Sequence, residues 1–155
     1  MLFEWIKILH IISASVLFGT GIGTAFYMFY VNFSNDTKLI ARATKQVVKA
    51  DWIFTGISGF IQPVTGFLLL YLKKFPFTAT WTIIVTNGYL FAGICWFIVV
   101  HLQIKCYKIA EEASIKKTPL PKSYRRYFAT WIALGIPAFT ALMIVLFFMA
   151  NSPFR

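Results

Sequence analysis

The chain has 155 residues, of which 59% are hydrophobic and 19% aromatic, and its mean hydropathy of +0.72 lies far above that of soluble globular proteins. This composition excludes an ordinary soluble domain. A net charge of +10 would suit a nucleic-acid partner, but the basic residues flank apolar runs, where membrane topology already explains them. We therefore expect no nucleic-acid binding.

Four apolar runs carry no charged side chain, and they cover residues 8–35, 52–72, 75–104 and 127–154. Each is long enough for a helix to cross the hydrocarbon core of a bilayer, which takes about 20 residues. A spanning β-barrel would instead show short segments of alternating polarity. The sequence predicts a single-domain all-α membrane four-helix bundle over 1–155, with spans near 5–31, 51–72, 81–106 and 127–150.

The segment between the first two runs, residues 35–50, has a different pattern. Lys38, Arg42, Lys45 and Lys49 recur three or four residues apart, so they share one stripe of a helix whose other side is largely apolar. This pattern predicts a short amphipathic helix at the membrane interface, with its basic side chains facing anionic lipid headgroups. The alternative is a surface that docks a partner protein.

Most of the 15 lysines and arginines lie in the loops that follow the first and third runs. Because loops rich in Lys and Arg tend to stay in the cytoplasm, we expect both of these loops there. Both termini, including Arg155, are then expected outside. The sequence thus predicts a multi-pass membrane protein.

The second run is rich in glycine and contains a polar side chain at membrane depth. Gly59, Gln62 and Gly66 share one helix face, so Gln62 should point into the bundle and away from lipid. Pro63 frees the backbone carbonyl of Gly59 and favours a kink. The face is either a pocket wall or a helix contact in which Gln62 is hydrogen-bonded across the bundle. The candidate pocket residues are Gly59, Gln62, Gly66, Asn87 and Tyr89.

His10 and His101 are the ionisable side chains of interest at membrane depth. They should lie ~20 Å apart along the bilayer normal. One iron cannot bind both, because its axial nitrogens would be only ~4 Å apart. If His10 is an axial ligand of haem b, or a ligand of another metal, its partner must come from the same depth of the bundle, where Met143 is the candidate second ligand.

Tyr89 and Met149 are fallback partners for His10 if Met143 does not serve. The alternative for His10 itself is a buried imidazole hydrogen-bonded to a carbonyl, to Ser13 or to Asn87. We find no glycine-rich phosphate loop and no His-x-x-x-His pair, so nothing points to a nucleotide site or a hydrolase.

The chain resembles a bacterial integral-membrane family, domain of unknown function 2269, in five short runs of residues. These runs are 7–14, 50–55, 62–66, 95–103 and 135–139. The resemblance implies a location in the bacterial cytoplasmic (inner) membrane, but the family name implies no activity. Residues 5–12 are also similar to the opening of the bacterial membrane protoporphyrinogen oxidases and, more loosely, to the copper-resistance D proteins. Those oxidases carry a histidine there and are thought to hold haem, which implies haem at His10. Their His-x-Lys near the start of the third helix has no counterpart at residues 81–89.

Two functions from different classes follow from these observations. The first is a b-type haem or porphyrin-associated redox protein of the membrane. The second is a non-enzymatic membrane subunit that binds lipid or assists a partner, either another membrane protein or a second copy of the chain. The residues leave open whether the protein is an enzyme.

Overall fold

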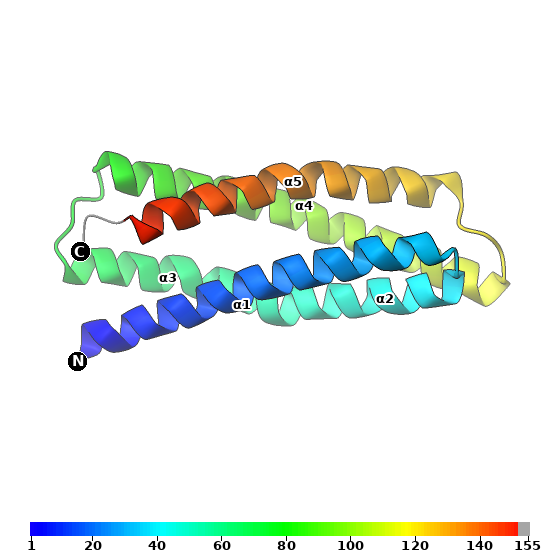
Figure 1. Ribbon diagram of the computed structural model, residues 1–155, viewed down its shortest axis with the longest axis horizontal. Coiled ribbons are helices and arrows are strands. Elements are labelled where there is room, and N and C mark those ends of the chain that lie inside the picture. The colour runs from blue at the N-terminus through cyan, green and yellow to red at the C-terminus, as the bar shows by residue number, and fades with distance from the viewer. Residues whose placement is uncertain (152–155) are drawn as a thin grey trace.

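The computed structural model describes residues 1–151, which form four helical rods joined by short connections (Figure 1). The first rod is α1 (Leu2–Val31), which ends in the 3-10 turn Asn32–Ser34. The second rod consists of α2 (Thr37–Ala50), the π-helical segment η2 (Asp51–Gly56) and α3 (Ile57–Leu72). The last two are α4 (Thr80–Lys116) and α5 (Lys122–Ala150). All four rods are long and apolar enough to cross a membrane, which confirms the predicted fold class.

The structure does not show the separate interfacial helix that the pattern of residues 35–50 predicts, because α2 continues through η2 into α3. The side chain of Asp36 caps the start of α2 by accepting hydrogen bonds from two backbone N–H groups, at 2.9 and 3.1 Å. Ile40, Ala43 and Val47 are each only 1% exposed, and α2 packs against α1 and α4. The amphipathic pattern is real, but protein rather than lipid covers its apolar side.

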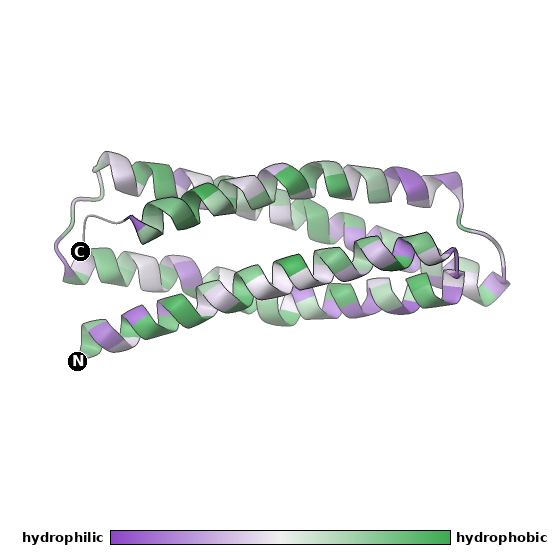
Figure 2. Cartoon of the chain, in the orientation of Figure 1, coloured by the Kyte–Doolittle hydropathy of each residue, from purple (hydrophilic) through white to green (hydrophobic). Residues whose placement is uncertain are grey.

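The tightest packing lies at the basic end of the molecule, where α2 meets α1, α4 and the start of α5. Met28, Ile40, Cys106 and Tyr124 belong to one cluster and are at most 2% exposed. The Tyr124 hydroxyl also donates a hydrogen bond to Oδ1 of Asn32 at 2.8 Å, which ties α5 to the end of α1. Figure 2 shows hydrophilic residues along α2 and at the adjoining ends of α4 and α5. This end holds the rods together.

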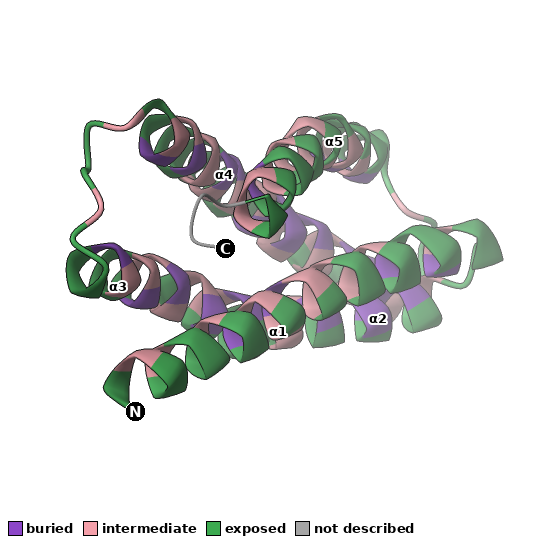
Figure 3. Ribbon diagram, turned by 60° about the vertical axis from the view of Figure 1, so that its left-hand side comes forward, coloured by how far each residue is buried: buried purple, intermediate pink, exposed green. Residues whose placement is uncertain are grey.

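Away from α2 the rods separate into two pairs, α1 with α3 and α4 with α5 (Figure 3). The second pair is close because of Gly88, where an added Cβ would lie 2.9 Å from Cγ2 of Val145. In the most apolar stretches of α5 and α1, only 6% and 11% of the residues are buried. The membrane half is therefore splayed, and most of its apolar surface is left for lipid or for a partner.

Candidate functional site

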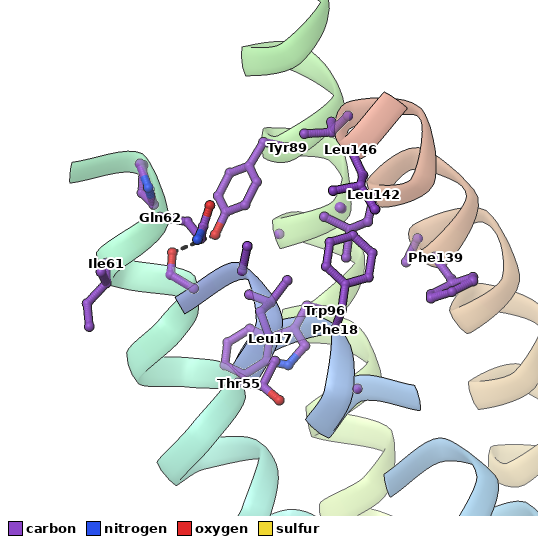
Figure 4. A pocket seen from close by; sticks show the side chains of 18 of the residues that line it. Leu17, Phe18, Thr55, Ile61, Gln62, Tyr89, Trp96, Phe139, Leu142 and Leu146 are labelled. Carbon is purple, nitrogen blue, oxygen red and sulfur yellow. Dashed lines mark hydrogen bonds between the residues drawn. The ribbon is translucent and has the colours of Figure 1, made fainter. Parts of the chain in front are cut away.

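A large cleft separates the two helix pairs and is the main cavity among the described residues. Its volume is about 2240 Å³, and its lining is mostly apolar. Figure 4 shows Gln62 and Tyr89 facing one another from α3 and α4, with Phe18 of α1 beside Leu142 and Leu146 of α5. The rings of Phe18 and Phe139 meet edge to face, with centroids 6.3 Å apart, so α1 and α5 touch across the cleft. A cavity of this kind suits a large apolar ligand with a few polar contacts.

His10 lies on the wall of this cleft, and its ring is held by α3. Its Nδ1 is 2.7 Å from Oγ1 of Thr65, a side chain that is only 3% exposed. A threonine hydroxyl has one proton, and that of Thr65 is directed to the Ile61 carbonyl at 2.7 Å. On this ground we assign Nδ1–H as the donor to Thr65, and the assignment leaves the lone pair on Nε2. Nε2 makes no hydrogen bond to any residue from 1 to 151.

Two residues of α3 contact His10, one at its ring and one at its backbone. Gly66 makes room for the ring, since a Cβ at that position would lie 3.4 Å from Cε1 of His10. Gln62 Nε2 donates to the His10 carbonyl and to Oγ of Ser13, both at 2.6 Å. Gln62 is 8% exposed and Ser13 is 4% exposed, so these are buried bonds that join α3 to α1. Both alternatives for this face apply, since Gln62 is hydrogen-bonded to α1 and also lines the cleft.

The irregularity at Pro63 supplies a second connection between helices. Because proline has no N–H, the carbonyl of Gly59 lacks its usual partner four residues on. The Tyr89 hydroxyl donates to that carbonyl at 2.6 Å and so links α4 to α3 across the cleft. A Cβ on Gly59 would sit 3.7 Å from both Leu17 Cδ1 and the Tyr89 hydroxyl oxygen, which is ordinary contact. The sequence predicted the free carbonyl but not the residue that satisfies it.

The cleft brings together five of the predicted site residues and leaves two others, Asn87 and Met143, outside. The five that line it are His10, Gly59, Gln62, Gly66 and Tyr89. Asn87 and His101 are exposed and do not line it. Met143 is 45% exposed and also lies off the lining, whereas Met149, two turns further along α5, does line the cleft.

Two residues of the site were missed by sequence reasoning. Thr65 is the acceptor for His10, and its signal was its position three residues after Gln62, on the same face of α3. Asp51 is 4% exposed and is the one buried acidic side chain in residues 1–151. In the sequence it lies at the edge of a charge-free run, next to a basic segment, and this position is typical of a loop residue. Its burial becomes apparent only because α2 continues into α3.

Four long apolar helices around a lateral cleft define a polytopic integral membrane protein. Residues 4–153 match the model of the family described as predicted integral membrane protein (DUF2269), and the chain belongs to that family. No curated protein and no solved structure matches the chain.

Proposed function

We propose that this protein is a small b-type haem or porphyrin-binding redox protein, with Nε2 of His10 as the axial ligand. The observation that carries the proposal is the hydrogen bond from His10 Nδ1 to Thr65. Metal-binding histidines almost always use their second nitrogen in this way, because it fixes the tautomer and the ring orientation. Here the bond leaves Nε2 with its lone pair on the wall of an apolar cleft.

The donor set and the size of the cleft also suit a porphyrin better than a bare metal ion. Within residues 1–151, no three His, Cys, Asp or Glu side chains lie close enough to hold a metal ion. A haem needs only one or two protein ligands, because the macrocycle supplies the rest. The cleft volume of about 2240 Å³ exceeds the 300–1,000 Å³ of common ligand pockets, which leaves room for a large flat ligand.

Each residue around His10 has a separate task in this proposal. Thr65 orients the ring, Gln62 holds the backbone of α1, and Gly66 provides the space that the ring occupies. Met149 replaces Met143 as the candidate second ligand, because Met149 lines the cleft and Met143 faces away from it. Bound haem iron would supply one-electron transfer. The polypeptide would bind it, surround it with largely apolar walls and set the ligand geometry.

The orientation of the protein follows from its charges. We propose that the basic end faces the cytoplasmic side of a bacterial inner membrane, where anionic headgroups attract lysine and arginine. This end consists of α2, the end of α4 and the start of α5. His10 then lies in the outer half, and both termini lie outside. Arg155, part of that prediction, falls beyond the described residues 1–151.

A second candidate function is a non-enzymatic subunit that binds lipid or a partner helix. The observation that favours it is the exposure of α5, of whose most apolar stretch only 6% is buried. Such a face would be covered by another membrane protein or by a second copy of the chain. In this case the cleft would hold an acyl chain and not a porphyrin.

An absorbance spectrum of gently purified protein, made with ample haem, separates the two functions. The redox proposal predicts a Soret band that the His10→Ala variant loses and the His101→Ala variant keeps. His101 is the matched control because it is exposed and off the cleft. If the unaltered protein shows no Soret absorbance above that of His10→Ala, the haem proposal fails and the non-enzymatic one replaces it.

A further inference from the structure

Asp51 is a buried carboxyl group at the point where α1, η2 and α4 meet. Its Oδ1 is 3.1 Å from the hydroxyl of Thr24 on α1 and 3.1 Å from that of Thr55 on η2. Its Oδ2 is 2.7 Å from Nε2 of Gln103 on α4. All four side chains line the cleft, and Figure 4 shows Thr55 among the residues of its wall. This polar cluster is separate from His10.

No cation balances this carboxyl group. Among residues 1–151 the salt bridges do not include Asp51. The stretches of α1 and α3 near Asp51 carry no charged residue, and the side chains of Lys49 and His101 are exposed. The ammonium group of Lys105 contacts another side chain, since its Nζ lies over the Tyr127 ring, 5.0 Å from the ring centroid. An ionised carboxylate buried without a partner is strongly disfavoured. Neutralising Asp51 by a bound proton removes that penalty.

A count of hydrogens in the cluster supports the same conclusion. The hydroxyl of Thr24 has one proton, and its shorter contact, 2.8 Å, is to the Thr20 carbonyl in its own helix. If that proton is used there, the 3.1 Å contact between Thr24 and Asp51 joins two oxygens with no hydrogen between them. A proton on Asp51 Oδ1 supplies the missing hydrogen, and Thr24 then accepts.

Gln103 gives an independent sign that the cluster is short of hydrogens. Its side chain is 2% exposed, and its Oε1 is buried without a hydrogen-bond partner among the described residues. Buried acceptors are normally paired. Oε1 of Gln103 is therefore an acceptor of the cluster that no donor among residues 1–151 serves. The cluster is also built on a π-helical segment, a form of helix that is rare and frequent at functional sites.

We propose that Asp51 is a proton-binding site, occupied at neutral pH and able to exchange its proton through the cleft. In the occupied state Asp51 Oδ1–H donates to Thr24, and Thr24 donates to Thr20. On release the proton passes from Oδ1 to water entering the cleft, and the Thr24 hydroxyl turns from the Thr20 carbonyl to the carboxylate. Thr55 and Gln103 donate to Asp51 in both states. The proposal does not depend on a bound porphyrin.

Infrared spectroscopy of the protein in lipid reads the carboxyl group itself. At neutral pH we expect the carbonyl-stretch band of a protonated carboxylic acid, and a shift of this band to lower frequency in heavy water. The band should be lost in Asp51→Asn and kept in Glu112→Gln, whose carboxylate is exposed and paired with Lys116. Absence of the band from the unaltered protein would overturn the proposal. So would a band that appears only when sodium is withdrawn, since the site would then hold sodium.

A second variant tests the partner of the proton and does not require Asp51→Asn to fold. Thr24→Val removes the acceptor and nearly preserves the shape of the side chain. The acid band should then move to higher frequency, because the Asp51 hydroxyl has lost its hydrogen bond. Thr20→Val serves as control, because the Thr24 hydroxyl donates to the backbone carbonyl of Thr20, which the substitution keeps. An unmoved band in Thr24→Val would show that the proton is not where the proposal puts it.

Discussion

Replacing Thr65 with valine should separate the role of its hydroxyl from that of its volume. The change leaves His10 Nδ1–H, now 2.7 Å from an oxygen, against a methyl group in a largely buried position. A buried donor left without an acceptor costs about 1–3 kcal/mol of stability. The bond from Thr65 to the Ile61 carbonyl is also lost, but that carbonyl lies within a regular helix and keeps its backbone partner. Most of the expected cost therefore falls on His10.

The same substitution should weaken porphyrin binding, since a partner of the ligating histidine typically contributes ~10–100-fold to metal affinity. Haem titration into detergent-solubilised protein measures that affinity, and thermal denaturation of the haem-free protein measures the stability. Thr65→Ser keeps the hydroxyl and should restore both values towards those of the unaltered protein. If Thr65→Val and Thr65→Ser behave alike in both measurements, the hydroxyl does not orient His10 and the reasoning is refuted.

Three further predictions test the topology and the packing. In intact cells an impermeant thiol reagent should label Thr78→Cys, in the loop between α3 and α4. It should not label Thr118→Cys, in the loop between α4 and α5. The opposite result would show that the protein lies in the membrane the other way round. The Gly88→Ala variant should be less stable than Gly93→Ala by about 1–3 kcal/mol, because a Cβ at position 88 overpacks against α5 and a Cβ at position 93 meets open space. Equal melting temperatures of the two variants in detergent would contradict the close approach of α4 and α5. Tyr89→Phe should lose about 1–3 kcal/mol by removing the hydrogen bond to α3, and a melting temperature unchanged from that of the parent protein would show that the bond contributes nothing.

The spans were predictable because crossing a bilayer needs long apolar segments, and such segments are visible in a single sequence. The relation of α2 to α3 was not. The basic stripe at residues 38–49 looks the same whether its apolar side faces lipid or protein, and only the contact with α1 and α4 decides between them. Asp51 was missed for the same reason, since a charge at the end of an apolar run normally marks the membrane surface.

Within the site, residues that share a helix face were easier to predict than pairs that meet between helices. Spacing along the chain placed Gln62 beside Gly59 and Gly66, and the free carbonyl at Gly59 follows from the chemistry of proline. The partners of Gln62 and His10 depend on how α1 and α3 are rotated about their axes, which the sequence does not encode locally. Depth alone also favoured Met143, whereas the rotation of α5 turns it outward.

The central claim, that Nε2 of His10 binds the iron of a porphyrin, is tested most directly by the magnetic coupling between that iron and a ligating nitrogen. Protein made with ¹⁵N-labelled histidine and ample haem should show hyperfine coupling from the iron to one imidazole nitrogen. We expect the coupling in the unaltered protein and in His101→Ala, and its loss in His10→Ala. Coupling that persists in His10→Ala, or protein that binds no porphyrin at all, would contradict the account.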